Sequence, residues 1–203
     1  MLQRLVLASN NAGKLREFSD LLACKPFEVI AQASLGIESC AEPHDSFIEN
    51  ALEKARHAAI QSGLAALADD SGICLPFLSG APGVFSARYA ASLGSGPWSK
   101  DAQLSTDQQN NAALLAQLIE PLTPAYYYCV LVLLRHPKDP QPIIAQGYWH
   151  GAVRALPAGT GGFGYDPHFY IASENQTVAQ MPLYKKNQLS HRAQALRELL
   201  EQL

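Results

Sequence analysis

The stretch LVLASNNAGKLREF, residues 5–18, runs from an apolar segment through a polar hexad into an amphipathic pattern. Leu5–Ala8 predicts a buried strand, and apolar residues at helical spacing after the hexad predict a helix. This order aims backbone N–H groups and the positive end of the helix dipole at one spot, where an anion is stabilised. On its residues alone, the hexad Ser9–Lys14 has two interpretations: a strand-to-helix turn or a phosphate-binding loop.

The hexad is not a Walker A loop. It lacks the first glycine of that motif, and Leu15 stands where the metal-binding hydroxyl belongs. If the hexad binds phosphate, we expect carboxylates elsewhere in the chain to hold any metal.

Capping signals and apolar spacing predict the elements that follow. Phe27–Gln32 indicates a second strand. Ser46 with Glu49 three residues later indicates a capping box, and the helix after it has one apolar face and one polar face. Thr106 with Gln109 indicates another capping box before a helical stripe of Leu114, Leu115, Leu118 and Ile119.

The remaining elements are a pair of strands and a final helix. Residues 125–134 and 142–153, separated by a proline-rich turn, indicate antiparallel strands. A glycine-dense loop over residues 157–168 enters a short strand, and Ser190 is the expected cap of the last helix, whose inner face carries Leu196, Leu199, Leu200 and Leu203. Interleaved helices and strands with one hairpin predict a single α/β domain over residues 1–203 with a mixed sheet.

An apolar strand over residues 64–68 is predicted to end abruptly in the polar run DDSG, residues 69–72. Ligands of α/β proteins collect at the carboxyl ends of strands, although adjacent aspartates in loops are usually solvated. Taken together, the carboxylates of Glu42, Asp69, Asp70 and Asp166 would suit Mg²⁺, which typically binds one or two carboxylates and its substrate's phosphates.

Two further motifs remain ambiguous on their residues alone. GTGGFGYDP, residues 159–167, is either a flexible loop or a base-stacking pocket formed by Phe163 and Tyr165 between glycines. SHR, residues 190–192, is either an N-cap followed by solvated side chains or a set of donors for phosphate or a base carbonyl.

Composition narrows the class of protein. The formal charge is −3 and no block of Lys and Arg occurs, so a nucleic acid polymer is not an expected partner. The N-terminal apolar run is too short for a signal peptide, and the longest apolar run is about half the ~20 residues of a spanning helix, so no membrane association is expected. The dispersed cysteines Cys24, Cys40, Cys74 and Cys129 indicate reduced thiols, and we expect a soluble cytoplasmic protein.

Six motifs in order resemble the inosine triphosphate pyrophosphatase family, the non-canonical purine NTP pyrophosphatases. They cover nearly the whole chain: LASNNAGKLREF, FIENALEKARHAA, ADDSGI, GAPGVFSARYA, PAGTGGFGYDPHF and LSHRAQAL. The resemblance implies an elongated mixed sheet flanked by helices, with two lobes and the active-site cleft between them. It also implies a Mg²⁺-dependent homodimer that hydrolyses ITP, dITP and XTP to the monophosphate and pyrophosphate.

The resemblance also implies roles for individual residues. Glu42 and Asp70 are the expected metal ligands, and Asp70 is also the expected general base, while Asp69 and Arg88 lie beside the site. The expected triphosphate loop is Ser9, Asn10, Asn11, Ala12, Gly13 and Lys14. The other expected substrate contacts are Ser71, Phe163, Gly164, Tyr165, Asp166, Lys186, His191 and Arg192.

Two rival functions share these features. A nucleotide pyrophosphatase of different or broad base preference would carry the same acidic and basic groups. A nucleotide-sensing module could keep the fold without turnover, although Lys14, Glu42 and Asp70 argue against it. The stretch between Arg88 and Thr106 is longer than is typical of the family, so we expect it to cap the pocket or to extend the dimer contact.

Overall fold

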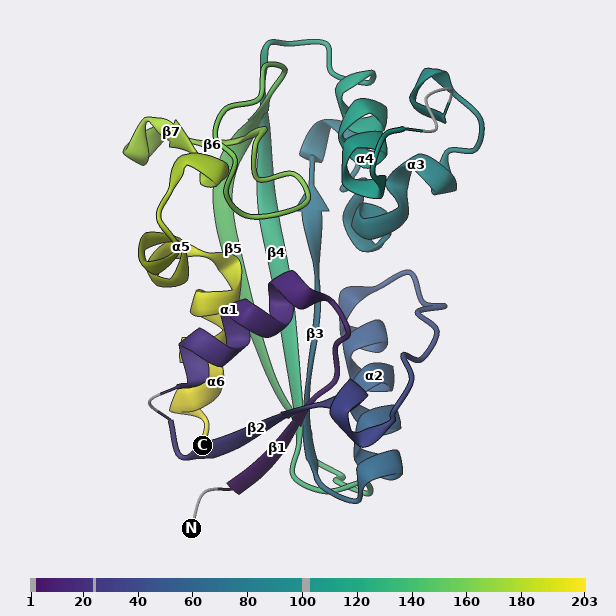
Figure 1. Cartoon of the computed structure of the whole chain (residues 1–203), viewed down its shortest axis with the longest axis vertical. Coiled ribbons are helices and arrows are strands. Elements are labelled where there is room, and N and C mark those ends of the chain that lie inside the picture. Colours follow the sequence, from purple (N-terminus) through teal and green to yellow (C-terminus); the bar gives the residue numbers. More distant parts are fainter. Residues whose placement is uncertain (1–2, 24, 100–102) are drawn as a thin grey trace. The chain divides into compact units, whose positions relative to one another are not determined.

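A computed structural model describes residues 3–23, 25–99 and 103–203. Its sheet has seven strands in the order β2-β1-β3-β4-β5-β6-β7 (Figure 1). The chain forms two compact units. Unit 1 is Met1–Asp70, Cys129–Gly147 and Ser190–Leu203, and unit 2 is Ser71–Tyr128 and Tyr148–Leu189. Three long strands contribute residues to both units: β3 (Ala65–Cys74), β4 (Leu122–Leu134) and β5 (Ile143–Arg154).

Unit 1 is a sheet with helices on both faces. β1 (Gln3–Leu7) pairs in parallel with β2 (Phe27–Ala31) and with β3. α1 (Ala12–Leu22) and α6 (His191–Glu201) lie on one face, and α2 (Phe47–Ser62) lies on the other (Figure 1). The apolar core under α1 and α6 includes Phe18, Leu22, Leu67, Leu131 and Leu199.

Unit 2 contains the remaining regular elements. Its helices are α3 (Tyr89–Ser92), α4 (Thr106–Leu115) and α5 (Leu183–Leu189). Its short strands are β6 (Phe169–Ile171), which is antiparallel to β5, and β7 (Gln176–Thr177), which is antiparallel to β6. A second apolar core includes Tyr89, Leu114, Tyr127, Trp149 and Phe169.

Short 3-10 helices complete the two units. In unit 1 the chain forms one at Gln32–Leu35. In unit 2 they lie at Pro76–Leu78, Gly83–Arg88, Pro97–Ser99, Ala172–Glu174 and Val178–Gln180.

The predicted α/β class and mixed sheet are confirmed. Parallel pairing around β1 and antiparallel pairing around β6 occur in the same sheet. The predicted strand pair is β4 and β5, which are neighbours joined by the short turn at residues 135–142. The interpretation of residues 1–203 as one domain stays a prediction.

One strand boundary was predicted wrongly. β3 does not stop at the two aspartates but continues to Cys74, so Asp69 and Asp70 lie in the middle of a buried strand. A carboxylate can occupy such a position when cations neutralise it, because pairing offsets part of the cost of burial. The polar run therefore marks buried ion pairs and not a strand end.

Two helix predictions also need correction. α4 is capped by Ser105 with Gln108, one residue earlier than predicted, because the side chain of Ser105 accepts from the N–H of Gln108. α4 ends at Leu115, and Ile119 beyond it is 73% exposed. In the last helix, Leu196 and Leu199 are buried as predicted, but Leu203 lies beyond the helix end and is exposed.

The structure describes three of the four cysteines. Cys40, Cys74 and Cys129 are free thiols, and Cys24 lies outside the described residues. Part of the long stretch after Arg88, residues 100–102, also lies outside them. No helix in the described part of the chain combines the length and the apolar character needed to cross a membrane.

Candidate active site

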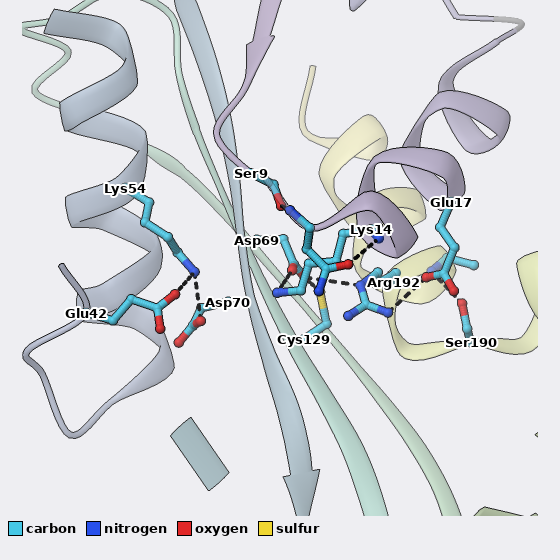
Figure 2. Close-up of polar contacts among 12 residues, drawn as sticks. Ser9, Lys14, Glu17, Glu42, Lys54, Asp69, Asp70, Cys129, Ser190 and Arg192 are labelled. Carbon is cyan, nitrogen blue, oxygen red and sulfur yellow. Dashed lines mark hydrogen bonds and ion pairs between the residues drawn. The ribbon is translucent and has the colours of Figure 1, made fainter. Parts of the chain in front are cut away.

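Asp69 and Asp70 divide the polar residues of unit 1 into two groups. Side chains of neighbouring residues in a strand point to opposite faces of the sheet. Figure 2 shows the two carboxylates on opposite sides of β3, each beside cationic side chains. Only 1% of Asp69 and 5% of Asp70 is exposed, so both carboxylates lie where a charge needs a partner.

Asp69 lies on the face covered by α1 and α6. Its Oδ1 pairs with Lys14 Nζ, and its Oδ2 lies 3.5 Å from Arg192 Nε. Cys129 Sγ donates to the same Oδ2 at 3.1 Å. Burial alone would raise the pKa of Asp69, but Lys14, Arg192 and Lys54 lower this pKa far below its usual range. Asp69 is therefore a permanent buried anion.

The Cys129 thiol supports this state. Burial, together with the charge of Asp69, raises the pKa of Cys129 well above its usual value. The sulfur stays protonated and acts as a hydrogen-bond donor to the carboxylate.

Asp70 lies on the face covered by α2. Lys54 Nζ donates to Asp70 Oδ1 at 2.8 Å and to Glu42 Oε1 at 2.9 Å, and so joins a residue of the loop before α2 to β3 (Figure 2). Burial raises the pKa of Asp70 although Lys54 and Lys14 act to lower it. Asp70 Oδ2 is buried and has no hydrogen-bond partner among the described residues. One oxygen of Asp70 is thus anchored, and the other is available for chemistry.

Lys54 remains a cation in this setting. Burial alone would lower its pKa, but the charges of Asp70, Glu42 and Asp69 raise this pKa above the usual value. The ammonium group therefore neutralises one charge of the Glu42 and Asp70 pair.

The hexad is half loop and half helix. Ser9 Oγ accepts from Asn11 N at 3.2 Å, and Asn10 is fixed through Ser39 and Gln32. Asn11 is the N-cap of α1, and its side chain accepts from Lys14 N at 3.0 Å. The remaining hexad residues form the first turn of α1: Ala12, Gly13 and Lys14.

His191 and Arg192 begin α6 and are buried. Arg192 Nη1 donates to Glu17 Oε2 at 2.8 Å, so the guanidinium lies between Glu17 of α1 and Asp69 of β3. This pairing joins residues 175 positions apart in the sequence. Recognition of a base by His191 and Arg192 stays a prediction.

Unit 2 gathers a separate polar cluster around Asp166. Its Oδ2 accepts from Lys186 Nζ at 2.7 Å and from Phe163 N at 3.0 Å, and its Oδ1 accepts from Tyr127 OH at 3.2 Å. Lys186 Nζ lies 4.9 Å from the centroid of the Phe163 ring, a cation–π contact. Buried Tyr165 donates through its hydroxyl to Ser86 O at 2.8 Å.

Two other predicted residues belong to unit 2. Ser71 is half-buried on β3, and Arg88 stacks over Phe85 at 5.3 Å. Within unit 1 the structure brings together Lys14 with Asp69 and Glu42 with Asp70, and within unit 2 it brings together Phe163, Asp166 and Lys186.

Lys54, Glu17 and Cys129 were not predicted as site residues from the sequence. Lys54 lies on the polar face of the predicted α2 helix, which is the one signal available for it. Its partners Glu42 and Asp70 are 12 and 16 residues away, so only the packing of α2 on the sheet identifies the contact.

The donor set on the Asp70 face is compatible with Mg²⁺. Carboxylate oxygens are the ligands that Mg²⁺ prefers, and this ion typically takes only one or two of them beside substrate phosphates. Glu42 and Asp70 supply two, and the buried Asp70 Oδ2 lacks a partner among the described residues. The described residues contain no group of three or more His, Cys, Asp and Glu arranged for a metal.

Comparisons with known proteins agree with one another. The model of the Ham1 family matches residues 5–202. A dITP/XTP pyrophosphatase from Ralstonia nicotianae is 54% identical over 203 residues, which cover 100% of this chain and 97% of that protein. A dITP/XTP pyrophosphatase from Nitrosomonas europaea is 50% identical, with 100% and 95% covered.

Solved structures show the same fold. A HAM1 protein from Coxiella burnetii matches with a TM-score of 0.82 and 39% identity, and the match covers 99% of this chain and 100% of that one. The Staphylococcus aureus Ham1 protein matches with a TM-score of 0.79 and 32% identity over 98% and 97% of the two chains.

Proposed function

Because this chain belongs to the Ham1 family, we propose that it is a nucleoside triphosphate pyrophosphatase that removes deaminated purine nucleotides. Its substrates are ITP, dITP and XTP, and its products are the nucleoside monophosphate and pyrophosphate. The similar bacterial proteins named dITP/XTP pyrophosphatase support this activity.

The observation that carries the proposal is the Asp70 face of β3. Lys54 holds Glu42 and one oxygen of Asp70, and this leaves the second buried oxygen of Asp70 without a partner among the described residues. Burying an unpaired polar atom costs about 1–3 kcal/mol, so such an atom in a well-packed region favours a functional role.

Asp70 has two roles in the proposed mechanism. Glu42 and Asp70 would hold Mg²⁺, which when bound neutralises charge on the phosphates. Asp70 orients a water molecule toward the α-phosphorus and accepts its proton. The oxygen of the water then bonds to the α-phosphorus, the bond from this phosphorus to the β-phosphate oxygen breaks, and pyrophosphate leaves with that oxygen. Burial raises the pKa of Asp70, the direction that makes a carboxylate a stronger base.

The triphosphate is proposed to bind at the hexad. Asn11 satisfies one N–H of the first turn of α1 and leaves other backbone donors of Ala12 and Gly13 for phosphate oxygens. Lys14 adds positive charge beside them. Ser9 and Asn10 supply polar side chains at the entrance to the helix.

The unit 2 cluster around Asp166 is proposed to contact the purine. Phe163 offers a ring for stacking, and the other expected contacts are Ser71, Gly164, Tyr165, Asp166, Lys186, His191 and Arg192. Hypoxanthine and xanthine carry an acceptor at position 6 where adenine carries a donor. Donors that pair with this oxygen would be left unpaired by adenine, which accounts for the rejection of ATP.

Assembly and location are further parts of the proposal. We propose that the protein works as a homodimer in the cytoplasm, where the nucleotide pool it acts on is located. The free thiols of Cys40, Cys74 and Cys129 support a reducing compartment.

A nucleotide panel tests the function. Purified protein with Mg²⁺ is incubated with ITP, dITP, XTP, ATP, GTP, CTP and UTP, and pyrophosphate and monophosphate are quantified together. We expect equal amounts of the two products from ITP, dITP and XTP and much slower release from the others. Preferential hydrolysis of pyrimidine nucleotides would contradict the proposed substrates, and no hydrolysis of any nucleotide would contradict an enzyme.

A further inference from the structure

The backbone N–H and the carbonyl oxygen of Gly164, which belong to the two peptide groups that flank it, both bond to side chains of α4. Asp107 Oδ2 accepts from Gly164 N at 2.8 Å, and Asn111 Nδ2 donates to Gly164 O at 3.0 Å. Asp107 and Asn111 are four residues apart and so lie on the same face of α4. The backbone at Gly164 is left-handed, with φ of +61°, which glycine adopts without strain.

The two bonds fix the orientation of this segment. Gly164 lies between Phe163, whose ring faces Lys186, and Tyr165, whose hydroxyl is tied to Ser86 O. If the backbone at Gly164 rotated, both bonds to α4 would break and Phe163 would move. The α4 contacts therefore determine where the Phe163 ring lies relative to Asp166 and Lys186.

The stability of α4 alone does not explain why position 111 carries an amide side chain. Its neighbour Asn110 uses both ends of its amide, accepting from Ala90 N at 2.9 Å and donating to Ala87 O at 3.0 Å. Asn111 is only 9% exposed, yet its Oδ1 is buried with no hydrogen-bond partner within the described parts of the chain. An apolar side chain would avoid this cost, so the donor to Gly164 is the contact that accounts for an amide here.

We propose that Asp107 and Asn111 are positioning residues that hold the Phe163–Asp166 loop ready for the base and thereby set how tightly the purine is bound. This inference rests on the proposed function, because it takes the loop to be the base-contacting segment. A loop held in its bound conformation avoids the entropy cost of ordering on binding, and that saving appears as affinity. Loss of either contact therefore raises KM and leaves kcat nearly unchanged, since the contact acts equally in the ground and transition states.

The test uses variants whose effects on stability and on KM differ. Asn111→Leu keeps the volume and removes the donor; we expect an unchanged or higher melting temperature with a KM for dITP raised about three- to tenfold, the range for one lost hydrogen bond. Asp107→Ala is expected to raise KM by a similar factor. Asp107→Asn retains an acceptor and is expected to restore a KM near that of the wild type.

Ser105→Ala is the matched control. It removes the N-cap of α4 without touching Gly164, so it is expected to lower the melting temperature and to leave KM unchanged. The proposal is overturned if Asn111→Leu and Asp107→Ala leave KM unchanged, or if Ser105→Ala raises KM as much as they do. The wild-type protein in the same assay separates the two hypotheses: an inactive wild type contradicts the proposed function, whereas an active wild type with unaffected variants contradicts this inference alone.

Discussion

On the two faces of β3, the pKa values of neighbouring aspartates are shifted in opposite directions. Asp69, beside Lys14 and Arg192, has a pKa far below the usual range, whereas burial raises the pKa of Asp70 although Lys54 is bonded to it. Both side chains are buried, so the degree of burial does not separate them. The two carboxylates differ instead in the number of cations and hydrogen-bond donors around them, because every added positive partner stabilises the anion and lowers the pKa.

This difference assigns different tasks to the two residues. Asp69 is engaged by Lys14, Arg192 and Cys129 and is suited to holding those side chains in place. Asp70 has an oxygen without a partner among the described residues and is suited to accepting a proton. The four predictions that follow test this division, from the largest expected effect to the smallest.

Asp70→Asn is expected to lower kcat by about 10²–10⁴-fold, the usual range for loss of a general base. Lys54 keeps the carboxylate of Glu42 as its partner, so the melting temperature should fall less than for Asp69→Asn. The measurement is pyrophosphate release from dITP, with Asp20→Asn, an exposed aspartate of α1, as the control. Turnover near that of the wild type would remove Asp70 from the mechanism.

Asp69→Asn is expected to lower the free energy of unfolding by about 3–5 kcal/mol, because it leaves the half-buried Lys14 without its carboxylate and the buried Arg192 with Glu17 alone. Urea unfolding followed by circular dichroism measures this loss against wild type and Asp20→Asn. A variant as stable as the wild type would show that Asp69 is not the structural anion, and the contrast between the two faces would fail.

The ion pair between Arg135 and Asp139 lies away from the site and serves as a reference, which Asp139→Asn removes. Asp139 accepts from Arg135 Nη2 at 2.7 Å and from Gln141 N at 3.0 Å in the β4–β5 turn, and its hydrogen bonds with Arg135 lower its pKa. The Arg135 side chain is 46% exposed, so we expect a smaller drop in melting temperature than for Asp69→Asn, and one that salt reduces.

The pH dependence of this reference pair has a defined sign. Since the pKa of Asp139 is lower in the folded state, its stabilisation is complete above the ordinary aspartate pKa of about 4 and is lost as pH falls through the folded value. The melting temperatures of wild type and Asp139→Asn should therefore converge as pH falls below about 4, which thermal scans across pH 2–7 would measure. A difference that stays constant across this range would contradict the ion-pair explanation.

Cys129→Ala is expected to have the smallest effect, a loss of about 0.5–1.5 kcal/mol from the hydrogen bond to Asp69. Cys129→Ser keeps a donor and should be closer to the wild type. Chemical denaturation of both variants gives the comparison. Equal stability of Ala, Ser and wild type would mean that the thiol does not support the Asp69 anion.

Local sequence patterns predicted the elements of the fold. Apolar spacing and the Ser46 and Ser190 caps identified helices that the structure contains, with errors of a few residues at the ends. The strand order and the continuation of β3 past Asp70 were not predictable from such patterns. A polar pair normally ends an apolar strand, and here partners from distant segments, Lys14 and Lys54, make its burial possible.

The sequence by itself determined which elements form and which chemical groups the chain offers: a glycine-containing strand-to-helix turn, paired carboxylates and a glycine-rich loop with aromatics. The tertiary structure alone decided that Lys54 joins Glu42 to Asp70, that Arg192 lies between Glu17 and Asp69, and that α4 holds Gly164. The physical reason is that helix caps and apolar periodicity act over a few residues, whereas the protonation of a buried carboxylate depends on charges brought to it by packing.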